Sequence, residues 1–245
     1  QEQMLRAAFS KIKSYCGSAP LLIAKGNHDV RGSFQGADKV YDQTVLPLLA
    51  RELKQDRLDC SNYFFTHDND LYLFLDCMRP DFDYAERVLS SMKDVRYVFV
   101  LTHYPIFSVS KTDPNWIFYE NDAKKRHALQ QLLMEHDAIV LCGHDHTINL
   151  AEIASKKGSA VQFLVNSVFE TPRFNKLSNV KDEIKDHALK SHGESQAFYE
   201  FQNGLVRYFA AEGAGYAVMR VGPEGVWADL YCADNTSVAK SFHLK

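Results

Sequence analysis

The sequence lacks both a long hydrophobic run and a leader-like start. No apolar stretch approaches the ~18–20 residues that span a bilayer. The first residues, QEQMLRAAFSKIKSYCG, have no apolar centre of the kind that a signal peptide carries. We therefore expect a soluble chain without a membrane partner. Cytoplasmic and exported locations both fit the sequence, because a removed export signal would leave no trace.

Cysteine and an excess of positive charge are also missing. The five cysteines are odd in number and scattered, with no CxxC pair, so we expect neither a disulfide framework nor a thiolate zinc site. The net charge is −3 and the pI is near 6.4, which gives no basic footprint for a nucleic-acid backbone. What remains is a globular chain, 46% hydrophobic, with enough apolar material for one large core.

Helical and strand-like patterns alternate along the chain. The spacing of apolar residues predicts helices at 2–14, 43–54, 82–92 and 126–136, the second restricted by Pro47 to a start near Leu46. Apolar or β-rich runs predict strands at 21–25, 96–101, 138–142 and 160–165, and a hairpin over 62–76. This alternation predicts an α/β fold with a mostly parallel sheet and helices on both faces.

We expect a single domain over residues 1–245 with two additions. Residues from about 171 to 209 are charged, helix-prone and poor in β-branched residues, and we interpret them as a helical insertion over the core. Residues from about 215 to 232 contain two strand-like runs around a Pro-Glu-Gly turn, which predicts a C-terminal β-hairpin.

Three predicted strands end in polar stretches of similar kind. They run into Gly26-Asn27-His28-Asp29, into Thr102-His103-Tyr104-Pro105 and into Gly143-His144-Asp145-His146. The carboxyl ends of parallel strands share one edge of a sheet, where ligands bind in open α/β folds, so we expect the three loops to converge. They would gather imidazole nitrogens and an amide oxygen without a thiolate, a donor set that suits zinc, iron, copper, nickel or manganese.

The spacing His144-x-His146 suits a shared site. In an extended loop alternate residues point the same way, so both imidazoles can reach one site, and Gly143 permits a sharp exit from the strand. A single histidine is more often an ordinary loop or core residue than a ligand. For three such motifs at three predicted strand ends, chance is a much poorer explanation, because three separate coincidences would be needed.

The order of these three motifs resembles the calcineurin-like metallophosphoesterase superfamily, with a purple-acid-phosphatase-like branch as one option. The resemblance covers residues from about 15 to 170 and resumes in the closing hairpin. It implies a β-sandwich flanked by helices in αββα layers, so that the predicted sheet is one of two facing sheets.

The resemblance also implies roles for individual residues. Asn27, His103 and His144 would ligate one metal ion and His146 its neighbour, in a dinuclear centre of Fe, Mn or Zn. His28 would be the general acid and Asp29 the carboxylate that orients it. A metal-bridging hydroxide would then hydrolyse a phosphate monoester or diester of a small molecule or a protein.

The family also carries an Asp-x-His and a Gly-Asp motif on its first two strands, and the 245 residues contain neither in that place. Two interpretations stay open. In one, the natural chain extends upstream and the parent protein is a working enzyme. In the other, the metal site is incomplete, and the protein is an inactive module that binds a phosphoester or a partner. The first is favoured because the three retained motifs are intact.

The segment after Pro105 carries Trp116, Phe118 and Tyr119 close together, and Trp116 is a candidate for substrate stacking. The alternative is that these aromatic side chains pack the loop onto the core. Other enzyme classes fit less well, since GxSxG, Walker and dinucleotide-loop motifs are absent, as is the HExxH of zinc peptidases. The sequence does not indicate an oligomeric state.

Overall fold

The computed structural model of the protein describes residues 1–30, 36–107, 123–165, 175–176, 204–232 and 236–245. The chain divides into two compact units. Unit 1 comprises Gln1–Arg96 with Leu101–His103, and unit 2 comprises Tyr97–Val100 with Tyr104–Lys245. The prediction of one domain over residues 1–245 stays a prediction.

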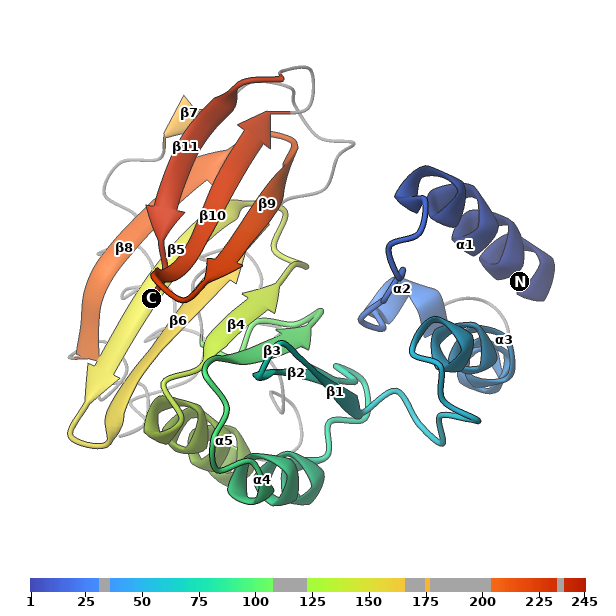
Figure 1. Ribbon diagram of the computed structural model, residues 1–245, viewed down its shortest axis with the longest axis horizontal. Helices are drawn as coiled ribbons and strands as arrows, with labels where there is room; N and C mark the ends of the chain where they lie inside the picture. Colours follow the sequence, from blue (N-terminus) through green and yellow to red (C-terminus); the bar gives the residue numbers. More distant parts are fainter. Residues whose placement is uncertain (31–35, 108–122, 166–174, 177–203, 233–235) are drawn as a thin grey trace. The chain divides into compact units, whose positions relative to one another are not determined.

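The described residues of unit 1 form four helices and a hairpin. They are α1 (Glu2–Cys16), α2 (Asn27–Val30), α3 (Ala37–Glu52), β1 (Tyr63–His67), β2 (Asp70–Leu75) and α4 (Phe82–Ser91) (Figure 1). The predicted helices at 2–14 and 82–92 are confirmed. The side chain of Asp81 caps α4 by accepting a hydrogen bond from the Tyr84 N–H at 2.9 Å.

The predicted start of the second helix near Leu46 is wrong, because α3 begins nine residues earlier, at Ala37, with Pro47 inside it. Proline removes one backbone hydrogen bond. Packing outweighs this loss, since Tyr41 and Leu49 on either side of the proline are each only 1% exposed. They belong to a core that also contains Phe9 and the stacked pair Tyr63–Phe74, whose ring centroids are 4.4 Å apart.

The hairpin β1–β2 is confirmed. Asp68 and Asn69 form its two-residue turn with φ of 49° and 66°, the left-handed pair that matches the twist of the flanking strands. The register pairs Tyr63 with Phe74, so the two stacked rings are direct cross-strand neighbours.

The predicted strand at 21–25 is wrong, since the described structure assigns no strand there. A strand needs a neighbour for its backbone groups, and here side chains contact them instead. The Tyr63 hydroxyl donates to the Ile23 carbonyl at 3.3 Å, and the Cys77 thiol donates to the Lys25 carbonyl at 3.2 Å.

Unit 2 contains most of the strands. Its elements are β3 (Val98–Thr102, whose last two residues count with unit 1), α5 (Ala123–Glu135), β4 (Ile139–Cys142), β5 (Ile148–Ser155), β6 (Gly158–Leu164), β7 (Asn175–Lys176), β8 (Leu205–Glu212), β9 (Gly215–Gly222), β10 (Gly225–Cys232) and β11 (Val238–His243). The predicted strands at 96–101, 138–142 and 160–165 and the helix at 126–136 are present. Sequence reasoning missed β5 and β11.

The prediction of a mostly parallel sheet is wrong for this unit. In the larger sheet β4 and β6 pair in parallel, whereas β5–β6, β5–β8 and β7–β8 are antiparallel. Strand β5 follows the Gly143–His146 loop without an intervening helix. It runs antiparallel to β6, whereas consecutive strands of a βαβ unit run parallel.

Two sheets face each other in unit 2, with a helix on the outer side. The three-stranded sheet β9–β10–β11 lies over the larger sheet (Figure 1). Phe242 of β11 contacts Phe163 and Phe209, with ring centroids 5.5 and 5.1 Å apart. The neighbouring residue Gln162 points to the other face, where its carboxamide binds the segment near α5. The protein is thus a mixed α/β chain with a large sheet flanked by helices, and the predicted fold class is confirmed.

The predicted insertion at 171–209 lies mostly outside the described residues. The structure has strands at 175–176 (β7) and at 205–209, the first part of β8, and the interpretation of the segment as a helical insertion stays a prediction. Phe209 pairs with Leu150 of β5, and this cross-strand packing decides the conformation of a segment whose charges suggested helix. Residues 215–232 form the antiparallel pair β9–β10. None of the helices in the described parts of the chain has the length and hydropathy to cross a membrane.

Candidate metal centre

Asn27 and His103 are in contact within unit 1. Asn27 begins the single-turn helix α2 and is only 2% exposed, and His103 follows directly after β3. The Oδ1 atom of Asn27 lies 2.9 Å from Nε2 of His103. The two predicted ligands of one metal ion, 76 residues apart in the chain, are therefore in contact.

Gly26 allows this contact. A Cβ atom at position 26 would lie 3.3 Å from Asp29 Oδ2 and 3.3 Å from both Cγ and Nδ1 of His103, tighter than ordinary packing. The absence of a side chain lets the imidazole ring rest against the turn. Glycine is needed here for the close approach of the His103 ring.

His28 and Asp29 point to different surroundings. His28 is exposed, whereas the Asp29 carboxylate turns back and accepts a hydrogen bond from the Gly26 N–H at 2.8 Å. Burial raises the pKa of Asp29, although the Gly26 N–H and the charges of Lys25 and His28 act in the opposite direction. Asp29 closes the turn that carries Asn27, and its predicted role in orienting His28 stays a prediction.

A buried lysine, Lys25, directly precedes the same turn and fixes it through ion pairs. The side chain of Lys25 is 0% exposed, and its ammonium contacts Asp38, Asp42 at 3.3 Å and Asp76 at 3.2 Å. Burial acts to lower the pKa of Lys25, but the three carboxylates outweigh it and leave the pKa raised. Through these ion pairs Lys25 connects the Gly26–Asp29 turn to α3 and to Asp76, directly after β2.

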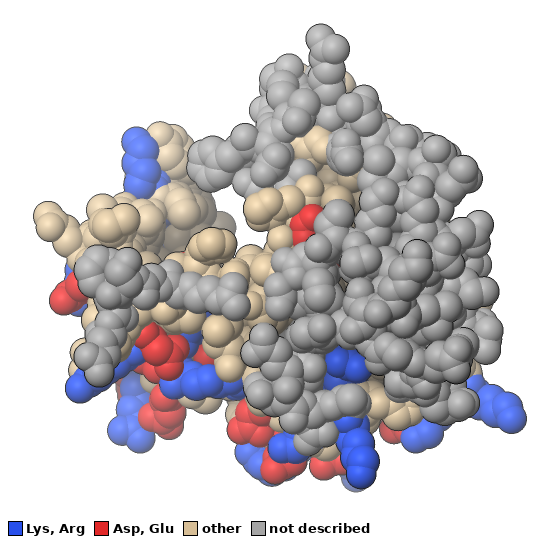
Figure 2. All heavy atoms as spheres, turned by 180° about the vertical axis from the view of Figure 1, so that it is seen from behind, with Lys and Arg blue, Asp and Glu red and all other residues tan. Residues whose placement is uncertain are grey.

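Arg79 completes this ion network from the solvent side. Its guanidinium lies 2.9 Å from Asp38, 2.8 Å from Asp42 and 3.4 Å from Asp76. Two cations and three carboxylates therefore share one cluster. Basic and acidic side chains also lie next to each other along the described part of the face shown in Figure 2.

Unit 2 carries the other two candidate ligands on a tight turn. The Asp145 N–H donates to the Gly143 carbonyl at 3.0 Å, and both histidines have left-handed backbones, with φ of 77° at His144 and 52° at His146. The prediction of an extended loop is therefore wrong, and positive φ falls on the histidines. Left-handed non-glycine residues cost backbone energy and gather at functional sites.

The ring of His144 packs against Tyr104. Their centroids are 4.4 Å apart and their planes are inclined by 66°, an edge-to-face contact. Asp145, between the two histidines, is 7% exposed, while His146 is exposed. Burial raises the pKa of the nearby Cys142 thiol well above its usual range.

The donors in unit 1 fit a divalent or transition-metal ion. Two donor atoms that each lie ~2.1 Å from one ion, at right angles, are about 3 Å apart. The Asn27–His103 distance of 2.9 Å matches this value and equally matches a hydrogen bond from an Nε2–H. Within the described residues no group of three or more His, Cys, Asp or Glu side chains forms a metal site. The amide oxygen of Asn27 is a donor outside that set.

Sequence reasoning missed two residues that contact the candidate ligands or their turn. Lys25 was counted as the end of an apolar run, and Tyr104 as part of a loop motif. The available signal for Lys25 was a charged residue at the end of an apolar run, directly before a glycine turn. Trp116, the candidate for substrate stacking, lies outside the described residues.

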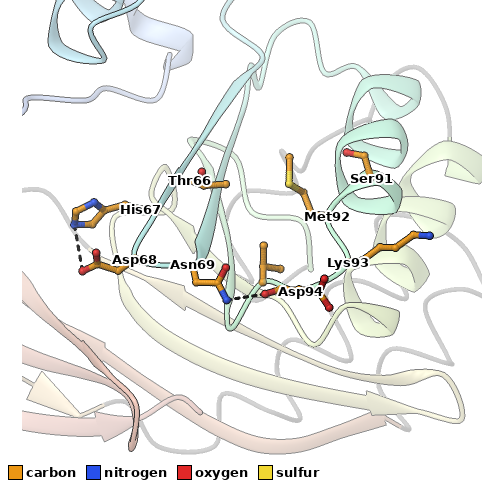
Figure 3. A pocket seen from close by; sticks show the side chains of 9 residues that line it. Thr66, His67, Asp68, Asn69, Ser91, Met92, Lys93 and Asp94 are labelled. Carbon is orange, nitrogen blue, oxygen red and sulfur yellow. Dashed lines mark hydrogen bonds and ion pairs between the residues drawn. The ribbon is translucent and has the colours of Figure 1, made fainter.

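A surface hollow in unit 1 contains none of the predicted site residues. It lies between the β1–β2 turn and the segment after α4 (Figure 3), and it is lined by Thr66, His67, Asp68, Asn69, Ser91, Met92, Lys93, Asp94 and Val95. The Asn69 carboxamide donates to the Asp94 carbonyl at 2.7 Å across it, and His67 lies 3.6 Å from Asp68. These contacts stabilise the β1–β2 turn.

The fold and the strand-end motifs define a metallophosphoesterase-type protein. Residues 1–147, more than half of the sequence, match the calcineurin-like phosphoesterase family, and the chain belongs to this family. Proteins of this family generally use divalent metal ions. A search of curated protein sequences gives no match.

Solved structures share the fold at low sequence identity. A purple acid phosphatase from yellow lupin (Lupinus luteus) seeds is 11% identical with a TM-score of 0.54, over 90% of this chain and 39% of that one. PhoD is 13% identical with a TM-score of 0.51, over 92% of this chain and 50% of that one. The chain thus spans half or less of these two proteins.

Proposed function

We propose that this protein hydrolyses phosphate monoesters or diesters at a dinuclear metal centre. Asn27, His103 and His144 ligate one ion, and His146 ligates its neighbour. The observation that carries the proposal is the contact between the Asn27 amide oxygen and the His103 imidazole inside a family match that spans both residues. An amide oxygen and imidazole nitrogens suit manganese, iron or zinc.

Two further observations support the assignment of His144. Within unit 2 the His144 ring packs against the buried ring of Tyr104, so the imidazole has an aromatic neighbour that limits its orientation. The left-handed backbones of His144 and His146 cost energy in the folded chain. Strain at two residues of one motif is expected where these side chains have a function.

His28 is the proton donor for the leaving group. Its exposure on a one-turn helix leaves its ring accessible to a bound phosphoester, beside the buried Asn27. Asp29 and Gly26 hold the turn that carries both residues. Bound ions would supply positive charge to the phosphate oxygens and lower the pKa of a water molecule. The substrate is a phosphoester of a small molecule or of a protein.

The leaving-group dependence of His28→Ala tests the acid role. We expect turnover of an alkyl phosphate to fall at least tenfold more than turnover of p-nitrophenyl phosphate, because a good leaving group needs little protonation. The matched control is His67→Ala, since His67 is an exposed histidine of the same unit outside the site. Equal losses for both substrates in His28→Ala would contradict the acid role.

Metal content tests the centre itself. The full-length natural protein should hold about two transition-metal ions per chain, and Asn27→Ala and His103→Ala should each lower that content. Bound phosphate without turnover, at less than one ion per chain, would favour the inactive binding module. Sequencing the parent gene upstream of Gln1 shows whether Asp-x-His and Gly-Asp motifs are encoded there.

A further inference from the structure

Tyr104 lies next to a backbone segment that is fixed by hydrogen bonds. The segment just after it is clamped by two buried carboxamides. Gln162, 0% exposed, accepts from the N–H groups of Ile106 and Phe107 at 2.8 and 3.0 Å and donates to the Phe107 carbonyl at 2.9 Å. Gln130, 5% exposed, donates to the Ile106 carbonyl at 2.8 Å. These hydrogen bonds fix the backbone of Ile106 and Phe107. Because Tyr104 is only two residues before Ile106, they also restrict the backbone of the tyrosine.

His144 is placed differently. It lies in a turn with left-handed backbone at positions 144 and 146, a conformation that only the surroundings can maintain. An imidazole on such a turn can rotate about χ1 and χ2 unless a neighbour blocks the alternative rotamers. Tyr104 is only 8% exposed, and its ring packs edge-to-face against the imidazole with the two ring centroids 4.4 Å apart.

We propose that Tyr104 is a positioning residue for His144, whose ring it holds in the orientation that ligates the metal ion. The inference rests on the proposed function, because it concerns the same centre. Tyr104 is assigned no contact with the substrate or the reacting atoms, and it acts through the imidazole. Ligands need to be held within about half an ångström of their productive position, and residues behind them supply that restraint.

The matched variants separate ring contact from hydroxyl and from general stability. Tyr104→Leu removes the edge-to-face contact, and Tyr104→Phe keeps it. Phe99→Leu removes a ring of similar size from β3 in the same unit, where Phe99 is 1% exposed. It therefore reports the effect of a core loss outside the site.

The first readout is the affinity for Mn²⁺ alone. The metal-depleted full-length protein is titrated by calorimetry, and each affinity is referred to the folded fraction measured by near-ultraviolet circular dichroism. We expect Tyr104→Leu to weaken Mn²⁺ binding about 10-fold or more, as for other residues that orient ligands. The Mn²⁺ affinities of Tyr104→Phe and Phe99→Leu, referred to the folded fraction, should stay within about threefold of the wild-type affinity.

The second readout is the nuclear magnetic resonance spectrum of the His144 ring without metal. A ring fixed beside an aromatic edge has a shifted, single set of ring-proton signals, and Tyr104→Leu should move them towards the shifts of a mobile histidine. Unchanged Mn²⁺ affinity and unchanged His144 signals in Tyr104→Leu would overturn the proposal, as would an equal loss of affinity in Phe99→Leu. A wild-type protein that binds no Mn²⁺ would instead overturn the proposed function, while the His144 signals would still test the hold of Tyr104.

Discussion

Replacing Lys25 by methionine should destabilise the protein by about 3 kcal/mol. Breaking a buried ion pair by removing one partner costs ~3–5 kcal/mol, because the other charge is left buried. Asp76 is that partner, with a side chain 1% exposed. It would keep Arg79 at 3.4 Å and the N–H groups of Met78 and Arg79 at 2.9 and 3.2 Å, which puts the expected loss at the low end of the range.

Urea unfolding followed by circular dichroism measures this loss as a change in midpoint at constant slope. The control is Lys13→Met, since Lys13 and Glu52 keep 29% and 15% of their side chains exposed and such a pair is worth ~0–1 kcal/mol. The double variant Lys25→Met with Asp76→Asn should recover part of the loss, because the uncompensated charge is gone. A loss below about 1 kcal/mol for Lys25→Met, or one equal to that of Lys13→Met, would refute the reasoning.

Three further predictions concern Gly26, Asp229 and Phe242. Gly26→Ala should push the His103 ring away and weaken Mn²⁺ binding about 10-fold, whereas Gly222→Ala, where no atom lies within 4 Å of the new Cβ, should leave calorimetric titrations unchanged. Hydrogen bonds from Arg220 and Ser241 lower the pKa of Asp229 below its ordinary 3.8, so its stabilisation is present at neutral pH and is lost as the pH falls below that value. The difference in melting temperature between wild type and Asp229→Asn should therefore shrink from pH 7 towards pH 3, and a constant difference would contradict this. Phe242→Ala should cost about 3–5 kcal/mol in urea unfolding, because it leaves a cavity between Phe163 and Phe209, and a loss under about 1 kcal/mol would count against that packing.

Local signals predicted the local structure well. The hairpin at 62–76 follows from a polar turn between β-rich runs, and its two left-handed turn residues belong to the residue types that tolerate this conformation. The start of α3 was mispredicted because Pro47 alone was taken to mark the beginning of the helix. The burial of Tyr41 and Leu49 along one face is a tertiary effect that a local rule does not contain.

Long-range pairing set the limit of prediction for the sheets. Strand β5 begins two residues after His146 and was missed because no helix separates it from β4. The first part of strand β8 was assigned to a helical insertion because its partners in β5 are more than 50 residues away in the chain. The strand-end motifs still predicted that Asn27 and His103 meet. The supports at Lys25 and Tyr104 depend on contacts that spacing alone does not reveal.

The left-handed turn at positions 144 and 146 makes folding and the proposed metal ligation place opposite demands on the same residues. Glycine at either position would adopt the observed φ without steric cost, so it would relax the backbone and remove an imidazole in the same step. A chain selected only for thermal tolerance would therefore drift towards glycine at these two positions. Under the proposed function, the imidazoles are worth this backbone cost only because they ligate a cation, so stability and activity make opposite demands on these two residues.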